Sequence, residues 1–296
     1  MKILVTGATG FVGQELVPAL ARIKDVSMLL LSRNEHTLMD VFGRGTYNTV
    51  AYANASDWVT IARFAPEIII HLAAYNSSKD DEDSVDKLMD SNVLFGVKLL
   101  TKMAPIGSLK FFINTGTFAQ YRFNDGSRKD AYFYAATKSA FEVFLEYFSS
   151  RDGFKYITAI PYSVYGGNKT IKRVIDYIVE SIDSPEPIGM TAGEQVLDFI
   201  HVKDVASFYC NAIEAYRKGA NISNGEHYFL GTGQGISIKL LSSMIESQKG
   251  GKCNIKWGVL PYRPQDIMHA VADLQCNSKT IAWEPRISLE EGLKNV

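Results

Sequence analysis

Residues 1–13 read MKILVTGATGFVG, an apolar run followed by a glycine-rich turn. Residues 3–6 have the composition of a buried strand and residues 14–23 the pattern of a helix, so the glycines lie between the two. Such a turn lets the backbone approach a diphosphate, and the helix N-terminus adds unpaired N–H donors. The stretch therefore predicts a dinucleotide site made by Gly7, Thr9, Gly10, Phe11, Val12 and Gly13.

Short apolar runs and helix-length stretches alternate through the first half of the chain. The expected strands are 3–6, 26–32, 67–71, 110–114 and 156–160, and the expected helices include 14–23, 85–103 and 134–150. This order predicts an α/β fold, a doubly wound parallel Rossmann sheet with a smaller C-terminal α/β substrate lobe. We assign residues 1–166 to the dinucleotide-binding domain, with a return to the main sheet at about 196–218. Residues 167–195 and 219–296 are assigned to the substrate-binding lobe.

Composition limits the possible partners. The 296 residues are 46% hydrophobic and 21% charged, with a net charge of −1 and no clustering of Lys and Arg. We therefore expect no nucleic-acid or membrane partner. The N-terminal apolar run is too short for a signal peptide, so a cytoplasmic protein is expected. The histidines lack ligand-like spacing, so no metal site is predicted, and His71, at the end of a buried strand, is interpreted as structural.

The end of the second expected strand bears on the choice of cofactor. Proteins of this fold that bind NAD usually place an acidic residue here, where it accepts a hydrogen bond from the ribose 2′-hydroxyl. This chain has Ser32 and Arg33 instead, and a guanidinium suits a 2′-phosphate. The sequence therefore favours NADP(H) as the cofactor, while NAD remains possible.

A tyrosine and a lysine lie four residues apart in the expected helix 134–150. Tyr134 and Lys138 fall on one helix face, and an apolar stripe of Phe133, Thr137, Phe141, Phe144 and Phe148 is expected to seat the helix on the sheet. An ammonium about 4 Å from a phenol, at an effective dielectric constant of about 20, contributes about 4 kcal/mol. This is about three pKa units, so Lys138 is expected to lower the pKa of Tyr134 to near neutral pH.

Several motifs, in order along the whole chain, are similar to those of extended short-chain dehydrogenases. They are TGATGFVG at 6–13, HLAA at 71–74, NVLFG at 92–96, NTGT at 114–117, YAATK at 134–138, PYSVYGG at 161–167, DFIHVKDVA at 198–206 and RPQDI at 263–267. Within that family the chain most resembles CDP-abequose and CDP-paratose synthases, which are 4-ketoreductases of CDP-3,6-dideoxyhexoses. This likeness rests on 112–115, 191–195 before 198–200, and 230–235.

The resemblance implies roles for individual residues. Thr117, Tyr134 and Lys138 would be catalytic: Thr117 would bind the substrate carbonyl, Tyr134 would exchange the proton, and Lys138 would also hold the nicotinamide ribose. The cofactor cleft would further include Asn54 beside the adenine, Leu72, Ala73, Ala74, Asn92, Pro161 and Val164. The substrate site would include Tyr75, Phe118, Ser163 and Arg263, the last of these on the diphosphate of a sugar nucleotide. The family's habit is a homodimer formed by helices 85–103 and 134–150.

Departures from the family pattern narrow the reaction. Phe118 and Ala119 follow Thr117 where dehydratases carry an Asp-Glu pair, so elimination is not expected. Leu197 and Ser163 stand where relatives often have Arg and Asn, which leaves the nucleotide open. The expectation is NADPH-dependent reduction of a nucleotide-linked 4-keto sugar. Two alternatives stay open: an NAD-dependent 4-epimerase of nucleotide sugars, and a non-catalytic NADP-sensing Rossmann protein.

Overall fold

The computed structural model describes residues 1–43, 50–167 and 172–296; residues 168–171, at the start of the expected substrate lobe, lie outside the described residues. Seven parallel strands form the main sheet, in the order β10-β6-β5-β4-β1-β2-β3. They are β1(Lys2–Thr6), β2(Ser27–Ser32), β3(Val50–Asn54), β4(Ile68–His71), β5(Phe111–Thr115), β6(Lys155–Pro161) and β10(Glu226–Leu230). The predicted fold class is confirmed, and each predicted strand is present with its ends shifted by at most one residue.

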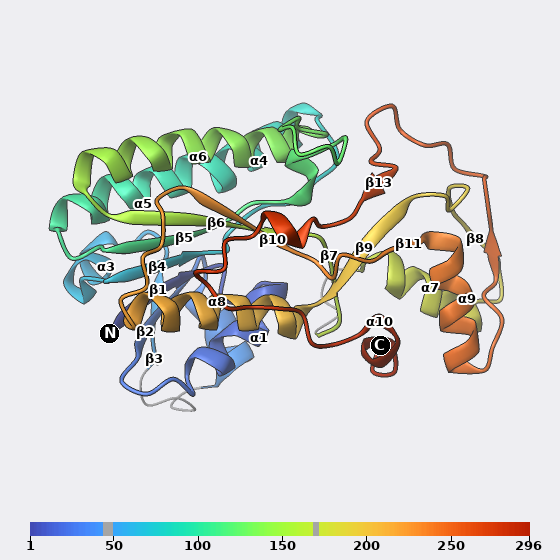
Figure 1. The fold of residues 1–296 in the computed structure, drawn as a ribbon, viewed down its shortest axis with the longest axis horizontal. Helices are drawn as coiled ribbons and strands as arrows, with labels where there is room; N and C mark the ends of the chain where they lie inside the picture. Colours follow the sequence, from blue (N-terminus) through green and yellow to red (C-terminus); the bar gives the residue numbers. More distant parts are fainter. Residues whose placement is uncertain (44–49, 168–171) are drawn as a thin grey trace.

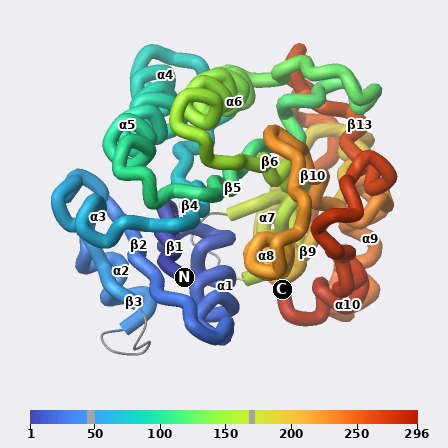
Figure 2. The backbone as a smooth tube through the Cα atoms, turned by 60° about the vertical axis from the view of Figure 1, so that its left-hand side comes forward, coloured from blue at the N-terminus to red at the C-terminus, as the bar shows by residue number. Residues whose placement is uncertain are grey.

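Helices cover both faces of this sheet (Figures 1 and 2). One face packs on α1(Phe11–Leu20), α2(Glu35–Phe42) and α8(Val202–Arg217), and the other on α3(Trp58–Phe64), α5(Phe95–Met103) and α6(Phe133–Asp152). Neighbouring strand residues alternate between the two cores, so that Ile3 and Val5 join the first and Leu4 the second. Burial on both faces explains why the strands are continuously apolar in sequence.

The expected helix 85–103 is interrupted. The structure has α4(Glu82–Met89), a π-helical turn η1(Asp90–Leu94) and then α5. Asn92 lies in the π-helical turn, fully buried, and its side chain accepts a hydrogen bond from the backbone N–H of Tyr75 at 2.7 Å. Single π-turns inside α-helices often occur at functional sites. Here the turn carries the amide that holds the segment after β4.

The remaining elements form a smaller body beside the main sheet (Figure 1, right). Its four-stranded sheet contains β7(Ser163–Tyr165), β9(Val196–His201), β11(Gly235–Ser237) and β13(His269–Ala270), and a second pair joins β8(Ile188–Gly189) to β12(Ile255–Lys256). The helices are α7(Val174–Asp183), α9(Ile238–Lys249) and α10(Leu289–Leu293). The 3-10 turns in the described residues are η2(Ala104–Ile106), η3(Phe118–Gln120) and η4(Leu274–Cys276). A separate apolar core includes Ile178, Leu241 and Leu293.

The return to the main sheet differs from the expected segment 196–218. β9 pairs with β7, β11 and β13 in the smaller sheet, whereas α8 packs on the main sheet and β10 forms its edge. β10 escaped prediction because its sequence, EHYFL, is polar at the start and only partly buried. β3, at the opposite edge, was also missed, and it too is only partly buried. The assignment of substrate binding to the smaller lobe stays a prediction.

Candidate active site

The glycine-rich turn connects β1 to α1 with little room for side chains. Gly7 has a φ of +67°, and a Cβ there would lie 2.6 Å from the backbone nitrogen of Ala73. A Cβ on Gly13 would lie 2.3 Å from the carbonyl oxygen of Ala8. Only glycine fits these positions, so the turn leaves backbone N–H groups open at the start of α1, beside Thr9, Phe11 and Val12. This cradle fits a dinucleotide diphosphate.

The segment after β4 packs directly on this turn. The hydroxyl oxygen of Thr6 accepts a hydrogen bond from the N–H of Ala73 at 3.2 Å and contacts Nδ1 of His71 at 2.9 Å. Leu72 donates its N–H to the carbonyl of Thr6 at 3.2 Å. Residues 72–74 are thereby brought beside the glycine turn, as the cofactor assignment requires. Ala74 is exposed, which leaves it facing open space.

Asn92 holds the same segment to α6. Its Nδ2 donates to the carbonyl of Tyr75 at 3.0 Å and to Oγ1 of Thr137 at 3.0 Å, and that hydroxyl donates to the carbonyl of Tyr134 at 2.7 Å. With Oδ1 also bonded to the N–H of Tyr75, the amide is fully engaged within the protein. Asn92 thus fixes the relative positions of Tyr75 and the start of α6.

The end of β2 presents an exposed arginine. Within the described ranges the side chain of Arg33 makes no ion pair or hydrogen bond, while Ser32 accepts a hydrogen bond from the N–H of Asn34 at 3.3 Å. The acid nearest to Arg33 in the sequence is Glu35, and its carboxylate already accepts a hydrogen bond from the N–H of Asn54 at 2.9 Å. The amide of Asn54 is used locally as well: Nδ2 donates to the carbonyl of Arg33 and Oδ1 accepts from Ser56.

Thr117 begins the 3-10 turn η3 at the end of β5. It is 8% exposed, and its hydroxyl oxygen accepts the N–H of Ala119 at 3.3 Å. Its own N–H donates to Oε1 of Gln120 at 2.9 Å. The ring of Phe118 stacks on Tyr162 with centroids 5.6 Å apart. The two residues after Thr117 therefore serve packing, and neither can exchange a proton.

Tyr134 and Lys138 stand one turn apart near the start of α6, which the structure extends from Phe133 to Asp152. Burial raises the pKa of Tyr134 to about 12, while the positive charge of Arg173 acts to lower it. Burial lowers the pKa of Lys138 to about 8, against the opposing influence of Glu142. The expectation that Lys138 brings Tyr134 near neutrality was wrong, because it counted the attraction between charges and omitted the cost of desolvating both groups.

The positive charge of Lys138 is felt by His71 at the end of β4. His71 is fully buried among the rings of Phe95, Phe112 and Phe141. Burial, followed by the charge of Lys138, lowers the pKa of His71 to about 3. The imidazole is therefore neutral at physiological pH, in agreement with a structural histidine.

Gln120 and Glu142 form a network that sequence reasoning missed. Glu142 lies four residues beyond Lys138 on α6 and is 6% exposed. Its carboxylate accepts from Nε2 of Gln120 at 3.0 Å, contacts Nε2 of His227 at 2.9 Å and pairs with Arg128 at 2.7 Å. Gln120 in turn accepts the N–H of Thr117, so the network links the Thr117 turn to the helix of Tyr134 and Lys138. The residues are scattered through the sequence, and only their fold brings them together.

The predicted site residues from the later part of the chain lie on β6, on β7 and in the loop before β13. Pro161 ends β6, and Ser163 and Val164 begin the strand β7. Arg263 is exposed, and its charge acts on the pKa of Tyr132, the residue before α6. Tyr132 donates to Asp266 at 3.4 Å, which ties the loop of Arg263 to the start of α6. In the described part of the chain the side chain of Ser163 forms no hydrogen bond.

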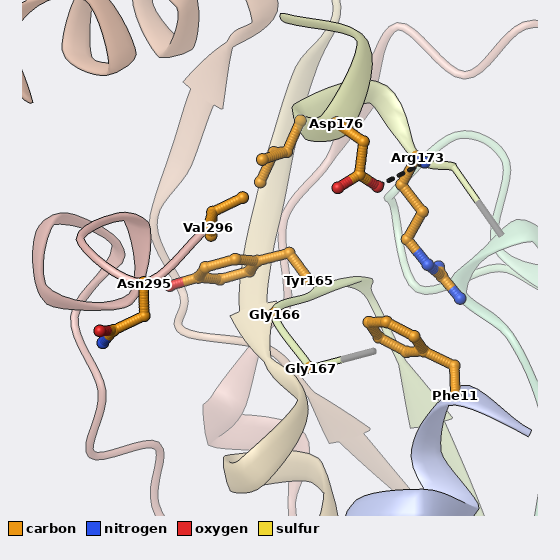
Figure 3. Close-up of a pocket in the computed structure, with 9 residues that line it drawn as sticks. Phe11, Tyr165, Gly166, Gly167, Arg173, Asp176, Asn295 and Val296 are labelled. Atoms are coloured by element: carbon orange, nitrogen blue, oxygen red, sulfur yellow. Dashed lines mark hydrogen bonds between the residues drawn. The ribbon is translucent and has the colours of Figure 1, made fainter. Parts of the chain in front are cut away.

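Arg173 is a further residue that the sequence did not single out. It lies at the start of α7, and its guanidinium stands over the ring of Phe11, 4.2 Å from the centroid (Figure 3). Together with Gly166, Gly167 and the chain end at Val296, it lines a small pocket. A larger hollow of about 750 Å³ lies between α8 and residues 274–286 and contains none of the predicted site residues.

No group of three or more His, Cys, Asp or Glu side chains in the described residues is arranged to hold a metal ion. Nor does any helix in the described ranges have the length and apolarity needed to cross a membrane.

The fold and site define a Rossmann-type dinucleotide-binding protein with a tyrosine–lysine pair beside the cofactor cradle. The model of the NAD-dependent epimerase/dehydratase family matches residues 3–231, and the chain belongs to this family. The chain is 26% identical to a CDP-abequose synthase of Salmonella typhimurium, over 99% of this chain and 96% of that one. It is 25% identical to a UDP-glucose 4-epimerase of Mycolicibacterium smegmatis, covering 99% and 96% of the two chains.

Among solved structures, a UDP-glucuronic acid 4-epimerase from Bacillus cereus, in complex with UDP-glucuronic acid and NAD, superposes with a TM-score of 0.87. It is 21% identical, and the match covers 100% of this chain and 97% of that one. At this identity the likeness establishes the fold. The sequence-based identification of the family is confirmed.

Proposed function

We propose that this protein reduces the 4-keto group of a nucleotide-activated 6-deoxy or 3,6-dideoxy hexose with NADPH, for the synthesis of surface-polysaccharide sugars. A CDP-, dTDP- or GDP-linked substrate fits the proposal. The similarity to CDP-abequose synthase supports the substrate class. The observation that carries the reaction class is the placement of Tyr134 and Lys138 one turn apart near the start of α6. Thr137 and Asn92 tie this helix to the segment beside the glycine turn. A tyrosine hydroxyl in such a position can donate the proton that ketone reduction needs.

The residues would act as follows. When bound, the reduced nicotinamide supplies a hydride to the carbonyl carbon at C4 of the sugar. The hydroxyl of Thr117 donates a hydrogen bond to the carbonyl oxygen, and Tyr134 gives its phenolic proton to that oxygen as the C4–H bond forms. Lys138 holds the nicotinamide ribose, and its positive charge stabilises the phenolate left on Tyr134. The absence of an acid–base pair after Thr117 keeps elimination from competing.

The cofactor and substrate assignments follow the same cleft. Arg33 is exposed and has no hydrogen-bond or ion-pair partner in the described ranges, so it suits a 2′-phosphate, whereas the carboxylate of Glu35 already bonds to the backbone of Asn54. We therefore propose NADP(H) rather than NAD. Tyr75, Phe118, Ser163 and Arg263 are proposed to contact the sugar nucleotide, with Arg263 on its diphosphate.

Replacement of Tyr134 tests the proposal. Tyr134→Phe removes the proton donor while keeping the ring, so turnover should fall by about 10²- to 10⁴-fold. The affinity for NADPH, measured by fluorescence titration, should stay within about twofold. Tyr177→Phe, at an exposed position of α7, is the control and should behave as the wild type. Turnover that survives in Tyr134→Phe would refute the assignment.

A 4-epimerase is the second candidate, favoured by the likeness to UDP-glucose 4-epimerases. An epimerase retains NAD and recycles it, so protein purified with bound NAD that interconverts 4-epimers without net cofactor consumption would decide for it. A non-catalytic NADP sensor is the third, and the presence of both Tyr134 and Lys138 speaks against it. The cytoplasmic location expected from the sequence stays a prediction.

We also propose a homodimer formed through α4, η1, α5 and α6. Apolar side chains are exposed on these elements, namely Met89, Leu94, Val143, Phe144 and Tyr147. Phe144, expected to seat α6 on the sheet, is 41% exposed and belongs to this outer face, because the stripe at 141 and 148 already covers the sheet. Light scattering of the purified protein at micromolar concentration should give the mass of two chains; a monomer would contradict the proposal.

A further inference from the structure

Arg173 points away from the helix that it begins. Its backbone N–H donates to the carboxylate of Asp176 at 2.8 Å, which caps α7. Its side chain extends in the other direction, toward Phe11 at the start of α1 (Figure 3). The carboxylate of Asp176 therefore bonds to the backbone of Arg173, and the guanidinium of Arg173 is available to another partner.

The guanidinium is short of hydrogen-bond acceptors. Its Nε is buried and has no hydrogen-bond partner among the described residues, and no ion pair of Arg173 occurs within them. Burial acts to lower the pKa of Arg173, although an arginine remains charged throughout the physiological range. A charged, partly desolvated group without acceptors is costly in a folded protein unless a ligand supplies them.

The position of this charge points to the ligand. Phe11 is the first residue of α1, where the glycine cradle presents N–H groups to a diphosphate. Arg173 is also the cation whose charge acts on the phenol of Tyr134. The guanidinium therefore lies near both the start of the phosphate cradle and Tyr134. A nucleotide bound there brings phosphate oxygens, which match the fork of an arginine.

We propose that Arg173 binds a nucleotide diphosphate across the cleft from the glycine turn. The proposal rests on the proposed function for the presence of two such groups, the diphosphate of the dinucleotide and that of the sugar nucleotide.

Calorimetric titration of the full-length protein tests the proposal without requiring turnover. The variants are Arg173→Met, which keeps the length of the stem, Arg173→Lys, which keeps the charge, and Lys172→Met as the matched control. Lys172 is 53% exposed at the same end of α7, where it pairs with Glu180 at 2.8 Å. NADPH and ADP probe the dinucleotide site, and CDP and UDP probe the sugar-nucleotide site. Thermal unfolding of each variant confirms that it is folded.

Arg173→Met should weaken at least one of the two pairs of ligands by about 10- to 100-fold, with a smaller loss in Arg173→Lys and none in Lys172→Met. A loss confined to NADPH and ADP assigns the residue to the cofactor diphosphate, and a loss confined to CDP and UDP assigns it to the substrate. Affinities within twofold of wild type for all four ligands would overturn the proposal. Because binding is measured, a loss of affinity would support it even if ketoreduction were disproved.

Discussion

The buried imidazole of His71 should make the folded protein sensitive to mild acid. Its pKa falls from 6.5 to about 3 because it is fully buried and close to the charge of Lys138. The unfolded chain therefore takes up a proton near pH 6.5 that the folded chain refuses until about pH 3. The site therefore costs the folded state nothing above pH 6.5, and stability is lost as the pH falls from 6.5 towards 3.

The size of the effect follows from the shift. At 1.36 kcal/mol for each pKa unit, the full window corresponds to about 5 kcal/mol, of which about 2 kcal/mol is lost between pH 6.5 and pH 5. Urea unfolding at intervals across these pH values measures it. The non-titrating variant His71→Gln should lose about 2 kcal/mol less than the wild type over the same range.

The comparison of slopes isolates His71 from other groups that titrate. His201 also has a pKa lowered by burial, and its contribution is common to the wild type and to His71→Gln. His269→Gln, at an exposed position of the smaller lobe, is the control and should keep the wild-type dependence. Parallel stability curves for wild type and His71→Gln would refute the reasoning.

Two further predictions concern the cradle and the network. Gly13→Ala should abolish detectable NADPH binding while leaving a folded protein, because its Cβ would meet the Ala8 carbonyl oxygen at 2.3 Å; titration and circular dichroism check this, and unchanged binding would contradict it. Glu142→Gln should cost about 1–3 kcal/mol in urea unfolding at pH 7, because it removes the charge that pairs with Arg128. Although burial alone would raise the pKa of Glu142, His227 and Arg128 hold it below its usual value, so the wild-type advantage should fade as the pH falls below about 4.5; an advantage that persists in acid would argue against this account.

Much of the fold was readable from the sequence because both faces of the central strands are buried. Such strands are continuously apolar and stand out between helical stretches, as in 3–6 and 110–114. The edge strands β3 and β10 were missed because they are only partly buried and their sequences mix polar and apolar residues. The π-helical turn was also missed; its Asn92 bonds to Tyr75, a residue of a different segment, and no local sequence pattern marks that contact.

The candidate site was likewise only partly predictable from the sequence. Local motifs revealed the glycine cradle and the Tyr134–Lys138 pair, whose spacing along one helix is fixed by the sequence. Arg173 was not recognised because its significance comes from its contact with Phe11, a residue 162 positions earlier. The direction of the Tyr134 pKa was misjudged because desolvation depends on the packing around the phenol, which a sequence does not display.

The central claim, net reduction of a nucleotide-linked 4-keto sugar, is tested most directly by one incubation. Purified protein is mixed with NADPH and a CDP-, dTDP- or GDP-linked 4-keto-6-deoxyhexose, and absorbance at the reduced nicotinamide band is followed together with the structure of the sugar product. We predict that one NADPH is oxidised for each 4-hydroxy sugar formed. Interconversion of 4-hydroxy epimers with no net oxidation of NADPH would contradict the claim.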